Sequence, residues 1–187
     1  MDNGIELMRS LHLMLTQAEI DLEMWQAMCK SREDREVMAM INRRYSRFYI
    51  AAENALFNSL ISILYKAFEN RKDTINLRQL RISLPNLNNP NIEAELDTLF
   101  KKIEVVWVKV CVLRNNIVGH QSSEKSAEDF HGIANITTLD LEVLVKDMQS
   151  FLLLIAKHFH DTHVIFNLKG AKSFENLISD LRAKNYS

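Results

Sequence analysis

Apolar residues between positions 92 and 117 recur at alternating intervals of four and three. The positions are Ile92, Leu96, Leu99, Ile103, Val106, Val110, Leu113 and Ile117. This spacing places all of them on one side of a single long helix, which must bury that side against other helices. Asn89-Pro90 marks the start, because asparagine caps a helix and proline fits its first turn. Such a segment predicts a helical bundle.

Residues that interrupt helices are rare, since the 187 residues include four glycines and two prolines. Apolar residues make up 47% of the chain, and helical periodicity extends over most of it. We therefore predict an all-α fold, an up-and-down bundle of four to five helices in one domain over residues 1–187.

Two further helices are expected before position 70. The first follows the capping residues Asp2-Asn3, with a buried stripe of Leu7, Leu11, Met14, Ala18, Leu22, Trp25 and Met28. Ser31 and Asp34 resemble a capping box that opens a second helix over about residues 33–70. Its inward positions would be Ile41, Tyr45, Phe48, Ala52, Ala55, Leu60, Leu64 and Phe68.

The rest of the chain predicts shorter elements. One short helix follows Thr74, and the polar residues 118–136 indicate a loop. Thr137-Thr138 would cap a helix whose buried residues are Leu141, Leu144, Met148, Phe151, Ile155 and Phe159. Ser173 would cap a last helix, at about 173–184, around Phe174, Leu177, Ile178 and Leu181.

Charge and sequence patterning limit the functional classes. A formal net charge of −1 disfavours non-specific coating of nucleic acid but permits a local phosphate site. Cys29 and Cys111 lie on apolar helical stripes, which predicts reduced core thiols in a cytosolic protein. The apolar segment 48–68 contains Glu53 and predicts a bundle helix rather than a membrane span. With no secretory signal at the start, we expect a soluble, cytoplasmic protein.

The segment LRNNIVGHQS, residues 113–122, carries the main functional candidates. Arg114 follows the core position Leu113, and its guanidinium matches the geometry of a phosphate. His120 is suited to proton transfer at neutral pH, and Asn115 could orient either group. On an unbroken helix the two side chains would diverge, so the helix must end between them. Gly119 would provide that end as a left-handed cap. The residues alone leave open a capped helix end without catalysis.

Residues 114–120, RNNIVGH, resemble the Arg-x(4–6)-His motif of the HEPN superfamily, whose members are small helical bundles. Asn115 matches the polar residue that usually follows the arginine, and Gly119 matches the small residue that often precedes the histidine. The upstream segment YIAAENALFNSLISILYKAFEN, the connection DTINLRQL and the long helix into the motif are similar to the abortive-infection (Abi) branch. The resemblance in layout covers about residues 1–165.

The resemblance implies a homodimer that cleaves RNA without metal or other cofactor. Attack of a ribose 2′-OH on its phosphate would leave a 2′,3′-cyclic phosphate, and this needs an acid, a base and positive charge. Arg114 would stabilise the phosphate, His120 would transfer protons, and a two-fold dimer would supply two histidines. The implied role is phage defence, or the toxin of a toxin–antitoxin pair with an antitoxin or regulatory partner. Two alternatives remain: a catalytically inactive HEPN dimer acting as an RNA-, nucleotide- or protein-binding adaptor or antitoxin, and a scaffold with an accidental motif.

Supporting residues are predicted on the second helix. Glu53 either holds the guanidinium of Arg114 or is a surface glutamate. Arg43, Arg44 and Arg47 surround an aromatic residue, a pattern typical of RNA-contacting surfaces but also of an ordinary charged helix face.

A histidine cluster near position 160 raises the question of a metal site. His158, His160 and His163 do not share one helix face, and polar residues are common where a helix ends. We therefore predict no metal site, and the sequence assigns these histidines no role.

Overall fold

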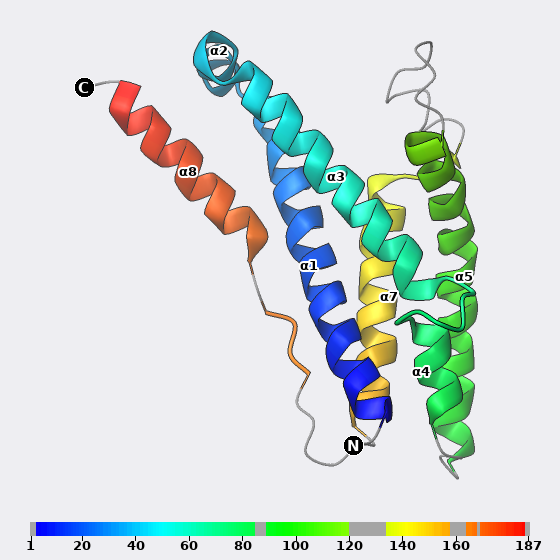
Figure 1. Ribbon diagram of the computed structural model, residues 1–187. Helices are drawn as coiled ribbons and strands as arrows, with labels where there is room; N and C mark the ends of the chain where they lie inside the picture. Colours follow the sequence, from blue (N-terminus) through cyan, green and yellow to red (C-terminus); the bar gives the residue numbers. More distant parts are fainter. Residues whose placement is uncertain (1–2, 85–88, 120–133, 158–163, 168, 186–187) are drawn as a thin grey trace. The chain divides into compact units, whose positions relative to one another are not determined.

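The computed structural model describes residues 3–84, 89–119, 134–157, 164–167 and 169–185 (Figure 1). Within these residues all regular structure is helical, which confirms the all-α prediction. The helices are α1 (Asn3–Ser31), α2 (Arg35–Arg44), α3 (Ser46–Phe68), α4 (Leu77–Ser83), α5 (Pro90–Gly119), α7 (Thr138–Ala156) and α8 (Gly170–Asn185). These seven described helices exceed the four to five predicted for the bundle, because α2 and α3 are separate and the short helix expected after Thr74, α4, is counted with them. No described helix is long and apolar enough to cross a membrane.

The chain divides into two compact units. Unit 1 comprises Met1–Thr16 and Ile61–Phe166, and unit 2 comprises Gln17–Leu60 and Asn167–Ser187. Both α1 and α3 contribute residues to each unit. The assignment of residues 1–187 to one domain, with a core over about residues 1–165, stays a prediction.

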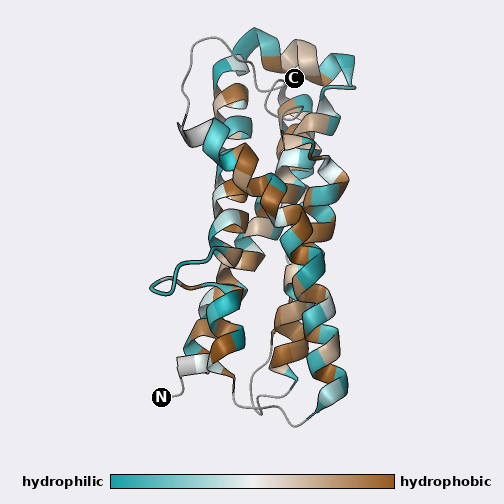
Figure 2. Cartoon of the chain, turned by 90° about the vertical axis from the view of Figure 1, so that its right-hand side faces the viewer, coloured by the Kyte–Doolittle hydropathy of each residue, from teal (hydrophilic) through white to brown (hydrophobic). Residues whose placement is uncertain are grey.

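Unit 1 is a helical bundle in which α5 packs against α7. The predicted seam of α5 is confirmed at Leu96, Ile103, Val110 and Leu113, which are fully buried, whereas Ile92, Leu99 and Val106 are half-buried. The buried positions of α7 include all the predicted ones that the structure describes: Leu141, Leu144, Met148, Phe151 and Ile155. Figure 2 shows the same division of each helix into an apolar and a polar face. Burial of these apolar faces is the main force that holds the bundle together.

The start of α7 is fixed as predicted by Thr137. Its hydroxyl accepts a hydrogen bond from the backbone N–H of Asp140 at 3.1 Å. The carboxylate of Asp140 in turn accepts one from the backbone N–H of Thr137 at 2.8 Å, which completes a capping box. The same carboxylate accepts a hydrogen bond from Nζ of Lys109 at 3.1 Å, so the cap also ties α7 to α5.

Arg78 of α4 connects the C-terminal end of α3 to α5. Its Nε donates to the carbonyl oxygen of Phe68 at 3.0 Å, and its Nη2 donates to Glu104 at 2.8 Å. Its guanidinium carbon lies 4.1 Å from the ring centre of Phe68 and 4.8 Å from that of Phe100. Arg78 therefore has a structural role, and its contacts fix the C-terminal end of α3 against α5.

Unit 2 departs from the prediction of one continuous second helix. The helix breaks at Tyr45, whose φ of −126° and ψ of 7° are not helical. The break shifts the phase of α3, so Phe48 and Ala55, predicted to face inward, are exposed, Phe48 by 69%. Tyr49 and Glu53 are buried in their place. Helix periodicity alone could not detect this break, because no glycine or proline marks it.

Two predicted caps in unit 2 are wrong. The N-cap of α2 is Asp34, whose carboxylate accepts from the backbone N–H groups of Glu36 and Val37. Ser31 instead donates to the carbonyl oxygen of Met28 at 2.7 Å, within α1. The last helix begins at Gly170 rather than after Ser173. Gly170 suits this start because a Cβ atom there would lie 2.7 Å from the carbonyl oxygen of Ile20.

Candidate functional site

Arg114 lies on α5 one residue after the fully buried Leu113, and its side chain is half-buried. Its guanidinium carbon is 4.8 Å from the ring centre of Tyr65 in α3. Its Nη1 donates a long hydrogen bond of 3.4 Å to Oδ1 of the neighbouring Asn115, which is exposed. The described residues offer Arg114 no carboxylate partner. The motif arginine is thus positioned by an aromatic ring while its charge stays available to an anion.

Tyr65 is held in place by Trp107 of α5. The two rings stack with their centres 6.0 Å apart at an angle of 23°. The indole Nε1 of Trp107 donates to the backbone carbonyl of Tyr65 at 3.0 Å. Because Trp107 and Arg114 are two helical turns apart on α5, this one tyrosine links α3 to two points of the motif helix.

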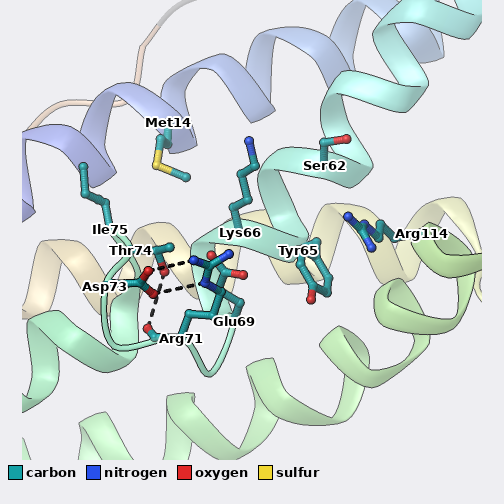
Figure 3. Close-up of a pocket in the computed structure, with 10 residues that line it drawn as sticks. All are labelled: Met14, Ser62, Tyr65, Lys66, Glu69, Arg71, Asp73, Thr74, Ile75 and Arg114. Atoms are coloured by element: carbon teal, nitrogen blue, oxygen red, sulfur yellow. Dashed lines mark hydrogen bonds and ion pairs between the residues drawn. The ribbon is translucent and has the colours of Figure 1, made fainter. Parts of the chain in front are cut away.

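A cavity of about 700 Å³ opens beside Tyr65 and Arg114. Figure 3 shows the residues that line it, which come from α1, the last two turns of α3, the connection to α4, and α5. They are Met14, Ser62, Tyr65, Lys66, Glu69, Arg71, Asp73, Thr74, Ile75 and Arg114. The lining includes three cationic and two acidic side chains, and the cavity volume is in the range of small-molecule sites.

One wall of the cavity is closed by an internal ion pair. The guanidinium of Arg71 donates to both carboxylate oxygens of Asp73, at 3.0 and 2.7 Å. This hydrogen bonding raises the pKa of Arg71 and lowers that of Asp73. The two charges therefore largely cancel each other.

Asn76 stabilises the backbone of this wall. It is fully buried, and its Nδ2 donates to the carbonyl oxygens of Arg71 and Thr74 at 2.8 and 3.2 Å. Its Oδ1 accepts from the backbone N–H of Gln79 at 2.8 Å, which makes Asn76 the N-cap of α4. The short helix predicted after Thr74 is thus confirmed and begins at Leu77, and the connection before it has a defined shape.

Three charged residues of the cavity have no ion-pair partner in the described residues: Lys66, Glu69 and Arg114. Lys66 is exposed, whereas Glu69 is only 7% exposed. Sequence reasoning did not single out the lining residues of α3. Ser62, Tyr65, Lys66 and Glu69 are spaced by three and four, so a test for polar residues on one face of that helix would have found them.

The second motif residue, His120, lies outside the described residues, so its approach to Arg114 stays a prediction. The helix α5 ends at Gly119, so it ends between Arg114 and His120 as predicted. The left-handed cap at Gly119 stays a prediction. His158, His160 and His163 also lie outside the described residues.

Glu53 has its own partners in unit 2. It forms an ion pair with Arg32 and accepts a hydrogen bond from Sγ of Cys29 at 3.4 Å. Its predicted support of Arg114 stays a prediction. Burial and the bond to Glu53 raise the pKa of the Cys29 thiol to about 11. Cys111 has a pKa raised to about 11 by burial, and both cysteines are free thiols, as predicted.

The predicted RNA-contacting arginines are at the surface. Arg43 and Arg44 are exposed in the last turn of α2, and Arg47 is exposed in the first turn of α3. No group of three or more potential metal ligands gathers within the part of the chain that the structure describes.

Comparison with known proteins identifies the family. The HEPN family model described as AbiU2 matches residues 3–176, which is nearly the whole chain. No curated protein and no solved structure matched the chain. The matched region includes all seven residues of the motif, the tyrosine that positions Arg114 and the complete lining of the cavity. The chain therefore belongs to the AbiU2 family, in the abortive-infection branch of the HEPN superfamily.

Proposed function

We propose that this protein is an endoribonuclease of abortive infection, which needs no metal and acts as a homodimer. The family and the RNNIVGH motif support this activity. The observation that carries the proposal is the position of Arg114, an arginine without a carboxylate partner in the described residues, held on Tyr65 at a polar cavity. A guanidinium kept in place but not neutralised is prepared for a phosphate.

The proposed reaction is attack of a ribose 2′-OH on the adjacent phosphorus. A base takes the proton of the 2′-OH, and an acid protonates the departing 5′-oxygen of the next nucleotide. The products are a 2′,3′-cyclic phosphate and a 5′-hydroxyl end. Arg114 stabilises the additional negative charge on the phosphorane, and Asn115, which already contacts Arg114, orients it.

His120 of the two copies would divide the proton transfers in this proposal. One imidazole acts as the base and the other, protonated, as the acid, so the site is complete only in the dimer. Arg43, Arg44 and Arg47 would hold RNA further from the reacting phosphate. Activation during phage infection, or control by an antitoxin, would keep such a nuclease from damaging its own cell.

The test is cleavage of an end-labelled single-stranded RNA by purified protein in EDTA. Wild type is compared with Arg114→Ala and His120→Ala, and with Arg9→Ala as a control at an exposed arginine of α1. We expect cyclic-phosphate ends from wild type and Arg9→Ala, and none from the two motif variants. A folded dimer that binds RNA without cutting it, with or without phage extract, would contradict the proposal and favour the adaptor function.

A further inference from the structure

Glu69 is a buried carboxylate that faces the cavity without a hydrogen-bond donor in the described residues. It follows the last residue of α3, Phe68, which is fully buried, and its own backbone N–H bonds back to Lys66. The side chain therefore has a fixed anchor. Only 7% of the residue is exposed, yet it is part of the cavity lining (Figure 3). A carboxylate that opens into a cavity and has no partner in the described residues is available to a ligand that carries hydrogen-bond donors.

The neighbouring charges do not satisfy Glu69. Arg71 is the nearest cation along the chain, and the charge of Glu69 contributes to its raised pKa. However, the guanidinium of Arg71 makes both of its hydrogen bonds to Asp73. The carboxylate of Glu69 is left free to accept N–H donors from a ligand.

Glu69 and Arg114 line the same cavity as Tyr65, the ring on which Arg114 rests. The cavity thus combines a cation that has no carboxylate partner in the described residues with a carboxylate that can accept hydrogen bonds. A ligand that matches both must carry an anionic group and N–H donors, as a nucleotide does.

We propose that Glu69 is a specificity-determining residue that binds guanine in the RNA substrate. Its carboxylate accepts the two parallel N–H donors of the Watson–Crick edge of guanine, from N1 and the 2-amino group, while a phosphate of the same strand lies at Arg114. Guanine is the base that presents two adjacent donors on this edge, and a carboxylate has two acceptor oxygens. The inference rests on the proposed function for its substrate, but it concerns recognition and not cleavage.

The test measures binding, so that it does not depend on catalysis. Fluorescent uridine hexamers with one central nucleotide changed to guanosine, inosine, adenosine or cytidine are titrated into protein carrying His120→Ala. We expect the guanosine RNA to bind about tenfold more tightly than all-uridine RNA, since a good bidentate pair discriminates at that level. Inosine, which lacks the 2-amino group, should fall between them.

The decisive variant is Glu69→Gln, compared with Glu95→Gln, which changes an exposed glutamate of α5. Glutamine offers one acceptor and one donor, which can pair with an adjacent donor and acceptor on the Watson–Crick edge of any of the four bases. We expect Glu69→Gln to lose the guanosine preference and bind the hexamers about equally, whereas Glu95→Gln behaves as its parent. A merely structural role of Glu69 would change the affinity for all hexamers alike and keep the preference.

The two proposals fail in different ways. An unchanged guanosine preference in Glu69→Gln, or equal binding of all hexamers by the parent protein, overturns the role of Glu69. In that case the proposed cleavage of RNA by the protein with His120 intact would not be affected. Conversely, base selection that depends on Glu69 in a protein that never cuts RNA supports the recognition site and contradicts only the nuclease.

Discussion

The guanidinium of Arg114 lies over the ring of Tyr65 at 4.8 Å, so a side chain of α3 positions the motif arginine of α5. Tyr65 is in turn stacked against Trp107 and receives the indole hydrogen bond on its backbone carbonyl. Such a ring restricts where the flexible arginine places its charge, and it leaves the N–H donors free. Several measurable consequences depend on this arrangement.

The first prediction concerns the ring itself. Tyr65→Ala should reduce kcat/KM for RNA cleavage by about fivefold, because a cation–π contact is worth on the order of 1 kcal/mol. Tyr65→Phe keeps the ring and should retain nearly full activity. Equal losses in the two variants would indicate that the phenol hydroxyl matters instead. The measurement is steady-state cleavage of one labelled RNA by all three proteins.

The charge on Arg114 should not be sufficient for its function. Arg114→Lys keeps a cation but loses the planar fork that contacts two phosphate oxygens, so cleavage should fall by about 100-fold. Unfolding in urea should change by less than about 0.5 kcal/mol, since Arg114 makes no ion pair with a described residue. Wild-type cleavage by the lysine variant would mean that Arg114 acts only as a general positive charge.

The wall of the cavity should depend on Asn76. Asn76→Ala removes the cap of α4 and the donors to Arg71 and Thr74, at a cost of about 2–3 kcal/mol in the free energy of unfolding. Asn70→Ala, at an exposed asparagine six positions earlier, is the control and should cost less than about 0.5 kcal/mol. Urea denaturation of both variants at pH 7 provides the comparison.

The cap of α7 predicts a pH dependence. The backbone N–H of Thr137 and the ammonium of Lys109 hold the pKa of Asp140 below its ordinary 3.8. The ionised form of Asp140 is therefore favoured in the folded state. Its contribution to the free energy of unfolding is complete above the pKa of the unfolded state, and it is lost as the pH falls through the pKa of the folded state. The stability difference between wild type and Asp140→Asn should be constant at neutral pH and narrow below pH 3.8.

Asp147 should change the stability of the protein with pH in the opposite direction to Asp140. Burial raises its pKa above 3.8, so its ionised form is unfavourable in the folded state. Relative to Asp147→Asn, wild type should gain stability as the pH falls through the folded pKa towards 3.8. The measurement is urea unfolding of wild type, Asp140→Asn and Asp147→Asn between pH 3 and 7. If the stability of wild type relative to the two variants changed in the same direction with pH, these assignments would be contradicted.

The last prediction concerns the thiols. Their pKa values of about 11, against an ordinary 9.0, reduce the thiolate fraction at pH 8 by about 100-fold, so alkylation of the folded protein should be slow. Glu53→Gln removes an acceptor and a negative charge beside Cys29 and should speed its alkylation. Cys111 serves as the internal control, because burial alone raises its pKa. Mass spectrometry of timed iodoacetamide reactions would separate the two sites.

Local interactions explain why much of the fold was predictable. The seam from Leu96 to Leu113 depends on spacing along one helix, and the caps at Asn89 and Thr137 depend on hydrogen bonds that span three residues. Such patterns are complete within a short segment and need no distant partner. The most specific part of the family resemblance was likewise a run of seven consecutive residues, and the match over residues 3–176 confirms the family.

The features that were missed depend on partners distant in the sequence. The break at Tyr45 redirects which face of α3 is buried, and the start of α8 depends on close approach of Gly170 to Ile20. The cavity forms only where the end of α3 meets α5. Nothing in the sequence therefore distinguished Glu69 from the other acidic residues. The sequence by itself thus determined the helical segments, the caps at Asn89 and Thr137 and the motif that marks the family. Tertiary packing alone decided which charged side chains share a cavity with Arg114, because burial and pairing are properties of the folded contacts and not of spacing along the chain.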